Sequence, residues 1–471
     1  MRIATGALLY LIFCAGMPAS DWPMFRGPNA SGVSEDKNLP VEFGPGKLEV
    51  WRTALPPGHS SPSIARDRIF VTAHYEEKLY VICLDRLSGK VAWRREAPRP
   101  RKEQLHKSNS PASPTVAADG RNAYAFFTDF GLISYGPDGN ERWRLPLGPF
   151  INPMGQAASP VLAGNTLLQI CDQESGSFFI AVEKDTGRVK WRVERPEFTR
   201  GFSTPVLYRP ATGGLQVLVA GSYQLTAFDV ETGGVVWWVR GLTWQLKPTP
   251  VIDGENVYVL GWAGEADPGQ QEVVPEFQDV LGKWDANKDG YLQPAELGDP
   301  RLAKKFADLD LDYDGSLGAR DWKMYQSKRS VVNSVRAYKL GGEGDMTDKN
   351  FLWRYEKSLP NVPSPLLYEG VLYILKEGGI LTSLDARTGR VLKQSRVTGA
   401  PGAYFASPIA GDGKLFTLSE EGKLAVIKAG GEWEILAVND LGESVHATPA
   451  IAGGKLYVRT HTALYCFAKG D

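Results

Sequence analysis

Short apolar runs of four to eight residues recur along most of the chain, and each is bounded by glycine, aspartate or asparagine. KLYVR (455–459) and VLYILK (371–376) are two examples, and LTAFDVETG (225–233) ends in a polar turn. Alternation of apolar and polar positions, broken by turn residues at this spacing, is typical of β-strands. The pattern therefore predicts an all-β protein made of many short strands.

The strands form a repeating unit that is marked by a small residue close to a proline. Successive marker prolines lie about 41 to 52 residues apart, except for an interval of about 115 between Pro250 and Pro365. Four short strands in every 40–50 residues are the signature of a β-propeller blade. Eight prolines predict eight blades: Pro62, Pro114, Pro160, Pro205, Pro250, Pro365, Pro408 and Pro449.

Tryptophans mark the last strand of most repeats. In four repeats a tryptophan follows a turn glycine by four residues, at Trp93, Trp143, Trp191 and Trp237. We assign Trp353 and Trp433 to the same strand of repeats five and seven, whereas repeat six has Lys393 there.

The eighth repeat ends at ALYCFAKGD, which leaves no room for its last strand, and KLEVWRTAL at 47–55 supplies that strand from the other end of the chain. We therefore predict an eight-bladed β-propeller closed by an N-terminal strand, which leaves the ring without free edges. A solenoid or a pair of β-sandwiches would not explain the missing and supplied strand.

The repeat resembles that of pyrroloquinoline-quinone (PQQ)-like, quinoprotein-type propellers, as in LDRLSGKVAW (84–93), FDVETGGVVW (228–237) and LDARTGR (384–390). The start of the chain, DWPMFRGPNASGVS (21–34), is similar to that of secreted bacterial members. The resemblance covers roughly 21–264 and 334–471, and it is specific for fold but weak for activity. It implies kinship with quinone-dependent dehydrogenases, with the propeller lipoprotein of the outer-membrane barrel-assembly machinery, and with many uncharacterised extracytoplasmic propellers.

The long interval holds a segment whose pattern changes from strand-like to helix-like. VPEFQDVLGKW, LAKKFADL and ARDWKMYQ have helical spacing and composition. They fall between the second and third strands expected for blade five. We predict a helical insertion at 265–332, preceded by propeller residues 21–264 and followed by propeller residues 333–471.

These helices flank two twelve-residue loops in which oxygen-bearing side chains recur at alternate positions. Calcium takes six to eight oxygen ligands, and a loop that offers them at positions 1, 3, 5, 7 and 12, with glycine at position 6, wraps around the ion. The first loop gives the candidate metal ligands Asp285, Asn287, Asp289, Tyr291, Gln293 and Glu296. The second loop gives Asp310, Asp312, Asp314, Ser316 and Asp321.

The closing residue distinguishes the two loops. Glu296 can bind through both oxygens, whereas Asp321 is shorter, so we expect one strong calcium site and one weaker site that accepts magnesium more readily. Leu292 and Leu317 at position 8 are expected to pair the loops. Such loops can be ordinary turns, but two complete loops between helices favour a compact EF-hand pair. Since extracellular calcium is abundant, we expect a permanently filled structural or docking module.

The first twenty residues have the layout of a secretory signal peptide. A basic residue precedes an apolar run at 3–16, and small residues follow up to Ser20. The run is too short to span a membrane. Cys14 raises the alternative of a lipoprotein, but Phe13 is too bulky for the small residue that usually precedes a lipidated cysteine. We expect a signal peptide at 1–20, no transmembrane segment, and an exported, soluble, monomeric protein in the periplasm or outside the cell.

The charge balance argues against nucleic acid or an anionic membrane as partner, and the few cysteines argue against a disulfide framework. The 471 residues carry 53 basic and 54 acidic side chains, so no overall field attracts nucleic acid or an anionic membrane. The basic cluster in PRPRKE (98–103) is expected to be a solvated loop. Cys83, Cys171 and Cys466 lie in strand-like runs, which predicts buried free thiols.

No familiar catalytic motif is present: the sequence contains no HExxH, GxSxG, phosphate-binding glycine loop or CxxC. Two histidines nevertheless lie three residues before a blade-starting proline, in register with an aromatic or basic residue of three other repeats. These positions should rim the central channel on the face from which the insertion emerges. They form a candidate ligand funnel, with ordinary loop residues as the alternative: His59, Phe202, Lys247, Phe405 and His446.

Three functions fit these features. The first is a non-enzymatic extracytoplasmic scaffold with a calcium-binding insertion, which binds an unknown protein or envelope ligand on the insertion-bearing face. The second is a quinone-dependent dehydrogenase. The adjacent cysteine pair that such enzymes typically carry is missing and no cofactor ligands can be placed, so PQQ is not expected. The third is an accessory propeller of outer-membrane barrel assembly, against which the poor lipidation signal and the insertion argue. We expect the first, with no catalytic residue.

Overall fold

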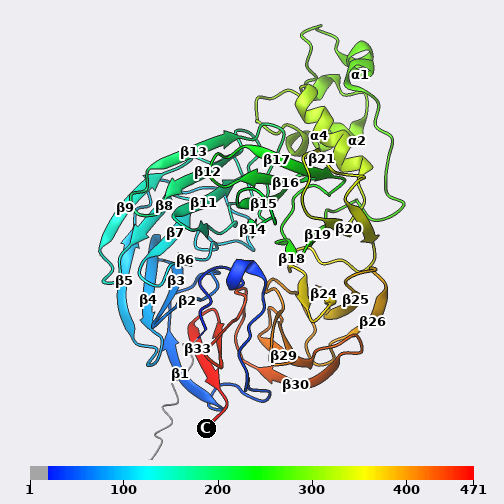
Figure 1. Cartoon of the computed structure of the whole chain (residues 1–471). Coiled ribbons are helices and arrows are strands. Elements are labelled where there is room, and N and C mark those ends of the chain that lie inside the picture. Colours follow the sequence, from blue (N-terminus) through cyan, green and yellow to red (C-terminus); the bar gives the residue numbers. More distant parts are fainter. Residues whose placement is uncertain (1–19, 471) are drawn as a thin grey trace, which may run out of the picture.

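The computed structural model describes residues 20–470, in which eight β-sheets form a ring (Figure 1). Seven sheets have four strands, and the fourth blade has a fifth strand at its outer edge. The predicted eight-bladed β-propeller is confirmed. The predicted signal peptide, Cys14 included, lies outside the described residues except for Ser20.

Within each blade the strands run outward from the centre of the ring. Blades one to four consist of β2 (Ser63–Ala65), β3 (Arg68–Tyr75), β4 (Lys78–Asp85) and β5 (Val91–Ala97); β6 (Ala117–Ala118), β7 (Ala123–Phe127), β8 (Gly131–Tyr135) and β9 (Glu141–Pro146); β10 (Val161–Ala163), β11 (Thr166–Cys171), β12 (Phe178–Glu183) and β13 (Val189–Glu194); and β14 (Val206–Tyr208), β15 (Gln216–Gly221), β16 (Gln224–Asp229), β17 (Val235–Arg240) and β21 (Gly344–Asp345).

Blades five to seven follow the same order. They consist of β18 (Val251–Asp253), β19 (Asn256–Gly261), β20 (Ser334–Lys339) and β22 (Phe351–Tyr355); β23 (Leu366–Tyr368), β24 (Val371–Lys376), β25 (Ile380–Asp385) and β26 (Val391–Arg396); and β27 (Ile409–Gly411), β28 (Lys414–Leu418), β29 (Lys423–Lys428) and β30 (Glu434–Asp440).

Blade eight is made from both ends of the chain. Its inner strands are β31 (Ala450–Ala452), β32 (Lys455–Arg459) and β33 (Ala463–Ala468), and its outer strand is the N-terminal β1 (Glu49–Ala54). β1 pairs antiparallel with β33, and Trp51 lies opposite Cys466. The predicted closing strand is confirmed, and it covers the edge that β33 would otherwise expose.

Neighbouring blades are joined by a tryptophan that packs on a turn glycine. Gly139 of blade two has φ 75°, and a Cβ atom there would lie 2.8 Å from the Trp93 ring, so glycine alone fits. The Trp93 indole also donates to the carbonyl of Pro137 at 2.8 Å. The same packing recurs in four further pairs: Trp51 with Gly89, Trp143 with Gly187, Trp191 with Gly233, and Trp353 with Gly389.

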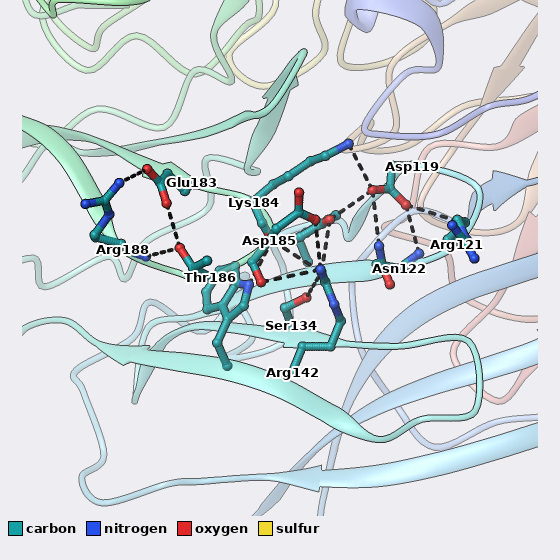
Figure 2. Close-up of polar contacts among 12 residues, drawn as sticks. Asp119, Arg121, Asn122, Ser134, Arg142, Glu183, Lys184, Asp185, Thr186 and Arg188 are labelled. Atoms are coloured by element: carbon teal, nitrogen blue, oxygen red, sulfur yellow. Dashed lines mark hydrogen bonds and ion pairs between the residues drawn. The ribbon is translucent and has the colours of Figure 1, made fainter.

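Charged side chains reinforce the joint between blades two and three (Figure 2). Arg142 on β9 donates to the carboxylate of Asp185 at 2.9 Å and to the carbonyl of Lys184 at 3.2 Å. A second ion pair crosses the same joint in the opposite direction: Lys184 Nζ of blade three lies 3.2 Å from Asp119 Oδ2 of blade two. Partial burial raises the pKa of Asp119, but hydrogen bonds, first that from the Asn122 amide, outweigh it and lower the pKa to about 2. The carboxylate is therefore charged at neutral pH.

Blades six and seven depart from this scheme. Lys393 on β26 occupies the tryptophan register, and its Nζ lies 4.5 Å from the Trp433 ring centre and donates to the Trp433 carbonyl at 2.6 Å. Trp433 itself precedes β30, where Ala437 pairs with Val426 in the tryptophan register. The assignment of Trp433 to that strand position is therefore wrong, and a lysine–tryptophan contact takes the place of the tryptophan–glycine joint.

The basic cluster at 98–103 is not a solvated loop. Arg99 Nε lies 2.6 Å from Asp129, and the Arg99 side chain is 11% exposed. Arg101 donates to the carbonyl of Thr128 at 3.0 Å. Both guanidinium groups anchor the segment between blades one and two to the β7–β8 turn. The expectation was wrong because their partners lie about 30 residues away along the chain.

The N-terminal segment before β1 crosses the centre of the ring, where the 3-10 helix η1 (Pro28–Ala30) is seen in Figure 1. Trp22 pairs with Ile64 of blade one, the Asn29 amide donates to Leu207 of blade four, and Arg26 donates to the carbonyl of Pro365 at 2.7 Å. The segment therefore contacts blades on opposite sides of the ring and spans one end of its central channel.

The connection between β19 and β20 of blade five leaves the ring as a helical unit (Figure 1). Its elements are α1 (Phe277–Trp284), η2 (Pro294–Glu296), α2 (Pro300–Lys304), α3 (Phe306–Leu309) and α4 (Ala319–Ser330). Phe277, Leu292, Leu317 and Trp322 belong to a small apolar core within this unit. All three segments expected to be helical contain helix, although LAKKFADL is divided into α2 and α3 at Lys305.

Cys83, Cys171 and Cys466 are buried and free, as predicted. Burial raises the pKa of the Cys83 thiol to about 12, so the protonated form dominates. In residues 20–470, no helix combines the length and apolar character needed to cross a membrane.

Candidate functional site

The centre of the propeller contains a cavity of about 420 Å³. Each of the five residues predicted to form a funnel lies four positions before the innermost strand of its blade, and all five line this cavity: His59, Phe202, Lys247, Phe405 and His446. The structure thus brings together residues from five blades. Their role in binding a ligand stays a prediction.

Three aromatic rings are stacked on one side of the cavity. His59 and His446 are parallel, with centroids 4.1 Å apart, and Phe405 lies 4.7 Å from His446. Burial, with a smaller effect of the neighbouring His446, lowers the pKa of His59 to about 3. Burial also lowers the pKa of His446, although Glu420 at 3.5 Å opposes this shift. Both imidazoles are therefore neutral near pH 7.

Lys247 supplies a cation to the cavity wall. Its Nζ donates to Asn361 Oδ1 at 2.8 Å and lies 5.9 Å from the ring centres of both Phe202 and Trp262. Burial, followed by the effect of Arg200, lowers the pKa of Lys247 to about 8. The ammonium form still predominates at pH 7.

Serine and threonine hydroxyls surround the channel at the inner ends of seven blades. The backbone amide of one such residue donates to the hydroxyl on the next blade, at 3.0–3.1 Å in seven bonds. The seven accepting residues all line the cavity and are called the hydroxyl belt: Ser61, Thr115, Ser159, Thr204, Ser364, Ser407 and Thr448.

The hydroxyl belt explains the residue that accompanies each marker proline. In six blades the belt residue directly precedes the proline, but in blade two Thr115 follows Pro114, so that proline is displaced from the common register. The sequence analysis missed the belt, although serine or threonine next to the repeated proline was the signal. The corresponding Thr249 of blade five donates its amide to Ser364, whereas its own hydroxyl has no partner among the described residues.

The two predicted metal loops lie side by side in the insertion. Leu292 and Leu317 exchange both backbone hydrogen bonds, at 3.1 and 2.9 Å, as expected for position 8. Gly290 and Gly315 at position 6 have φ 83° and 86°, which glycine adopts without strain. The loops therefore follow the same turn at the position that bends the chain.

The closing carboxylates make equivalent contacts. Glu296 accepts hydrogen bonds from the amides at the second and ninth positions of its loop, both at 3.0 Å. Asp321 accepts from the amides at the same two positions of its loop, at 3.2 and 2.9 Å. The shorter side chain thus reaches the same part of the loop as the longer one.

The other predicted ligands line the same loops and differ in charge density. Asp310, Asp312 and Asp314 bring carboxylate oxygens within 4.8 Å of one another. In the first loop, Asn287 takes the middle position, and its amide donates to Asp289 at 2.9 Å. The remaining candidates also stay in the loops: Asp285 accepts loop amides, Gln293 donates to Asp289, Ser316 donates to Asp314, and Tyr291 can offer its backbone carbonyl.

The second loop is more buried than the first. Asp310 is 6% exposed, and burial raises the pKa of Asp310 and of Asp321. Three clustered carboxylates repel one another unless a cation lies between them. Carboxylate and carbonyl oxygens are the ligands that calcium prefers, so both loops fit a hard divalent cation.

The insertion rests on the loops of blades three and four. Arg320, next to the closing Asp321, donates to the carbonyl of Glu174 at 2.6 Å. Lys328 Nζ lies 4.3 Å from the ring centre of Trp244, whose loop also carries Lys247 of the cavity wall. The insertion and the cavity mouth are therefore on the same face of the ring.

The family described as outer membrane protein assembly factor BamB matches residues 36–177, 174–274 and 313–471. Between the second and third matched ranges, residues 275–312 are unmatched and lie within the helical insertion. BamB from Moraxella catarrhalis is 13% identical, with a TM-score of 0.55 over 89% of this chain and 99% of that one. Quinohemoprotein alcohol dehydrogenase from Comamonas testosteroni is 13% identical, with a TM-score of 0.57 over 96% of this chain and 81% of that one.

At such low identity these structures show the shared fold alone. The computationally designed Ika8 protein, 9% identical, aligns over 92% of this chain and all of its own, with a TM-score of 0.55. No curated protein matches the chain. The family match covers most of both propeller segments. The chain belongs to the family of outer membrane protein assembly factor BamB.

Proposed function

We propose that this chain is a non-enzymatic, extracytoplasmic binding propeller whose insertion is a calcium-binding EF-hand pair. The observation that carries the proposal is the pairing of two loops with equivalent turns, each closed by a carboxylate held by equivalent amides. Two unrelated turns are not expected to have equivalent geometry over twelve-residue loops or to pair through Leu292 and Leu317. The partner, an unknown protein or envelope ligand, binds the face that carries the insertion.

Each loop offers oxygen ligands at the spacing that wraps a calcium ion. Glu296 can supply two oxygens to the first site, which makes it the stronger one. The second site has three clustered carboxylates but a shorter closing residue, Asp321, so it binds calcium more weakly and accepts magnesium more readily. Arg320 and Lys328 attach α4, the helix that follows the second loop, to blades three and four. A filled second loop would therefore stiffen the face of the ring that carries the insertion, which we call the decorated face.

Export is supported by one feature of the sequence and by the family. Residues 1–20 have the layout of a secretory signal peptide. The family is named for an outer membrane protein assembly factor. A monomer in the periplasm or outside the cell, without a lipid anchor, fits the calcium module because calcium is abundant there.

The family match favours a second candidate, an accessory role in outer membrane protein assembly. The helical insertion is the feature that this candidate leaves unexplained, since residues 275–312 lie outside the match. A quinone-dependent dehydrogenase has weaker support. Among the described residues that line the cavity, none is aspartate or glutamate that could hold a cation beside a quinone.

Calorimetric titration of chelator-treated protein tests the calcium module, and a dye-linked assay tests the enzymatic alternative. The proposal predicts saturable binding of calcium and no alcohol oxidation after addition of PQQ and calcium. Capture from an envelope extract, with and without chelator, then tests whether the decorated face binds a partner. Quinone-dependent turnover would overturn the non-enzymatic role, and an absence of calcium binding would overturn the module.

A further inference from the structure

The hydroxyl belt presents a ring of hydrogen-bond donors to the cavity. A hydroxyl has one O–H donor and two lone pairs. Each belt oxygen uses a lone pair to accept a backbone amide from the preceding residue of the ring, so its proton remains available. The belt side chains belong to residues only 2–3% exposed, and no acceptor for these seven protons exists among residues 20–470.

Buried donors in folded proteins nearly always have a partner. Seven donors from seven blades that face the same cavity therefore require acceptors inside it. Water can satisfy donors individually, whereas an oxyanion offers several lone pairs in one group and bonds more strongly through its charge. The donor count alone favours a ligand rich in acceptors.

The described residues that line the cavity include a cation but no carboxylate. Lys247 lies in the wall, and none of the described lining residues is acidic. Two fully buried guanidinium groups lie next to belt residues: Arg26 donates to the carbonyl of Pro365, and Arg459 donates to the carbonyl of Ser60 at 3.0 Å. No described carboxylate lies within ion-pair distance of either guanidinium.

These two arginines also have unused donors. Arg26 Nε and Nη1 and Arg459 Nε have no hydrogen-bond partner among the described residues. Burial lowers the pKa of both guanidinium groups to about 9, which shows that no nearby carboxylate offsets the loss of hydration. A buried charge without compensation is costly, and an anion close to it reduces that cost.

We propose that the hydroxyl belt and Lys247 bind a small molecule through its carboxylate or phosphate group, with Arg26 and Arg459 compensating the charge from behind. The rings of Phe202, Trp262 and Phe405 shield this group from water and leave room for an apolar body. This inference deepens the proposed binding role, on which it rests for a ligand at the decorated face, and it is independent of the calcium loops.

Titration calorimetry with benzoate, phenyl phosphate, inorganic phosphate and neutral benzamide tests this proposal. We expect one site per chain for at least one of the three anions and at least tenfold weaker binding of benzamide. The three anions distinguish a carboxylate from a phosphate ligand and show whether the ring contributes. The titrations use calcium-saturated protein and are repeated with chelator, so that failure of this site and failure of the calcium module give separate results.

Two variants with matched controls locate the site. Lys247→Gln should weaken binding at least tenfold, whereas Lys339→Gln on the exposed side of blade five should not change it. Ser407→Ala should also weaken binding, whereas Ser383→Ala, which removes a buried hydroxyl that likewise accepts a backbone amide, should not. Thermal melting checks that each variant is folded. Absence of saturable anion binding, or binding unchanged in Lys247→Gln, would overturn the proposal.

Discussion

The imidazole rings of His59 and His446 stack face to face, with centroids 4.1 Å apart and an angle of 2° between their planes. His59 precedes the first strand of blade one, and His446 precedes the first strand of blade eight. The contact therefore spans the joint where the ring closes and forms part of the cavity wall. Protonation of His59 would place a charge in this stack without a described carboxylate within ion-pair distance, whereas Glu420 lies 3.5 Å from His446.

Stability should fall in mild acid because of this pair. The pKa of His59 is about 3 in the folded protein and about 6.5 in the unfolded chain, so the unfolded state binds more protons between these values. The free energy of unfolding therefore decreases as pH falls from about 6.5 towards 3, by up to about 1.4 kcal/mol per pH unit for this residue. Chemical denaturation at pH 7, 5.5 and 4.5 measures the slope.

Replacement of the histidine isolates its contribution. His59→Gln should lose less stability than the wild type over this pH range, because glutamine binds no proton. His106→Gln, at an exposed lysine-flanked position, serves as the control. Equal pH slopes for His59→Gln and the wild type would contradict the account of the buried stack.

Replacement of a glycine that packs against a tryptophan of the neighbouring blade should destabilise the protein. Gly139→Ala should reduce the free energy of unfolding by about 2–4 kcal/mol, because a Cβ atom would meet both an unfavourable φ and the Trp93 ring. Gly164→Ala is the matched control, since Gly164 has φ 61° but open space around its Cβ position. It should cost about 1 kcal/mol. Similar losses in the two variants, measured by urea denaturation, would mean that the ring contact is unimportant.

Removal of metal should lower thermal stability. A ligand that binds the folded state alone stabilises it by about 2.7 kcal/mol at one hundred times its dissociation constant. Differential scanning calorimetry should therefore show a higher unfolding temperature in millimolar calcium than in chelator, with Asp321→Ala retaining part of the increase. The same temperature in both buffers would contradict a filled module.

Anion binding in the cavity should weaken in alkaline solution. Lys247, which faces Arg200, Glu377 and Asn361, has a pKa of about 8, so its charge is lost as pH rises through this value. The affinity for benzoate, which does not titrate in this range, should be lower at pH 9.5 than at pH 6.5, whereas Lys247→Gln should show a smaller change. An equal decrease in Lys247→Gln would assign the effect to another group.

The sequence predicts the blade count and the closing strand because both depend on a local pattern that recurs in each repeat. The place of Trp433 could not be predicted, because the turn before the last strand of blade seven is one residue longer than in blade one: Ile427 pairs with Ile435, whereas Leu84 pairs with Val91. The ion pair between Arg99 and Asp129 depends on two segments that meet only after folding.

In the candidate site, too, features that follow from the local repeat pattern could be predicted, whereas features that depend on contacts between distant segments could not. The recurring position four residues before each inner strand could be read from the repeats, and it correctly groups His59 with His446 in one cavity wall. The hydroxyl belt needed the closed ring, because the bond from Thr448 to Ser61 joins opposite ends of the chain. The buried positions of Arg26 and Arg459 likewise follow from the N-terminal crossing segment and the last blade, which no local pattern places beside the cavity.

Calorimetric calcium titration of the wild type and of Glu296→Gln tests the central proposal most directly. The account predicts one stronger and one weaker site in the wild type and loss of the stronger site in Glu296→Gln. The exposed Glu276→Gln, just before α1, should leave both sites unchanged. Absence of calcium binding to the wild type, or two unaltered sites in Glu296→Gln, would contradict it.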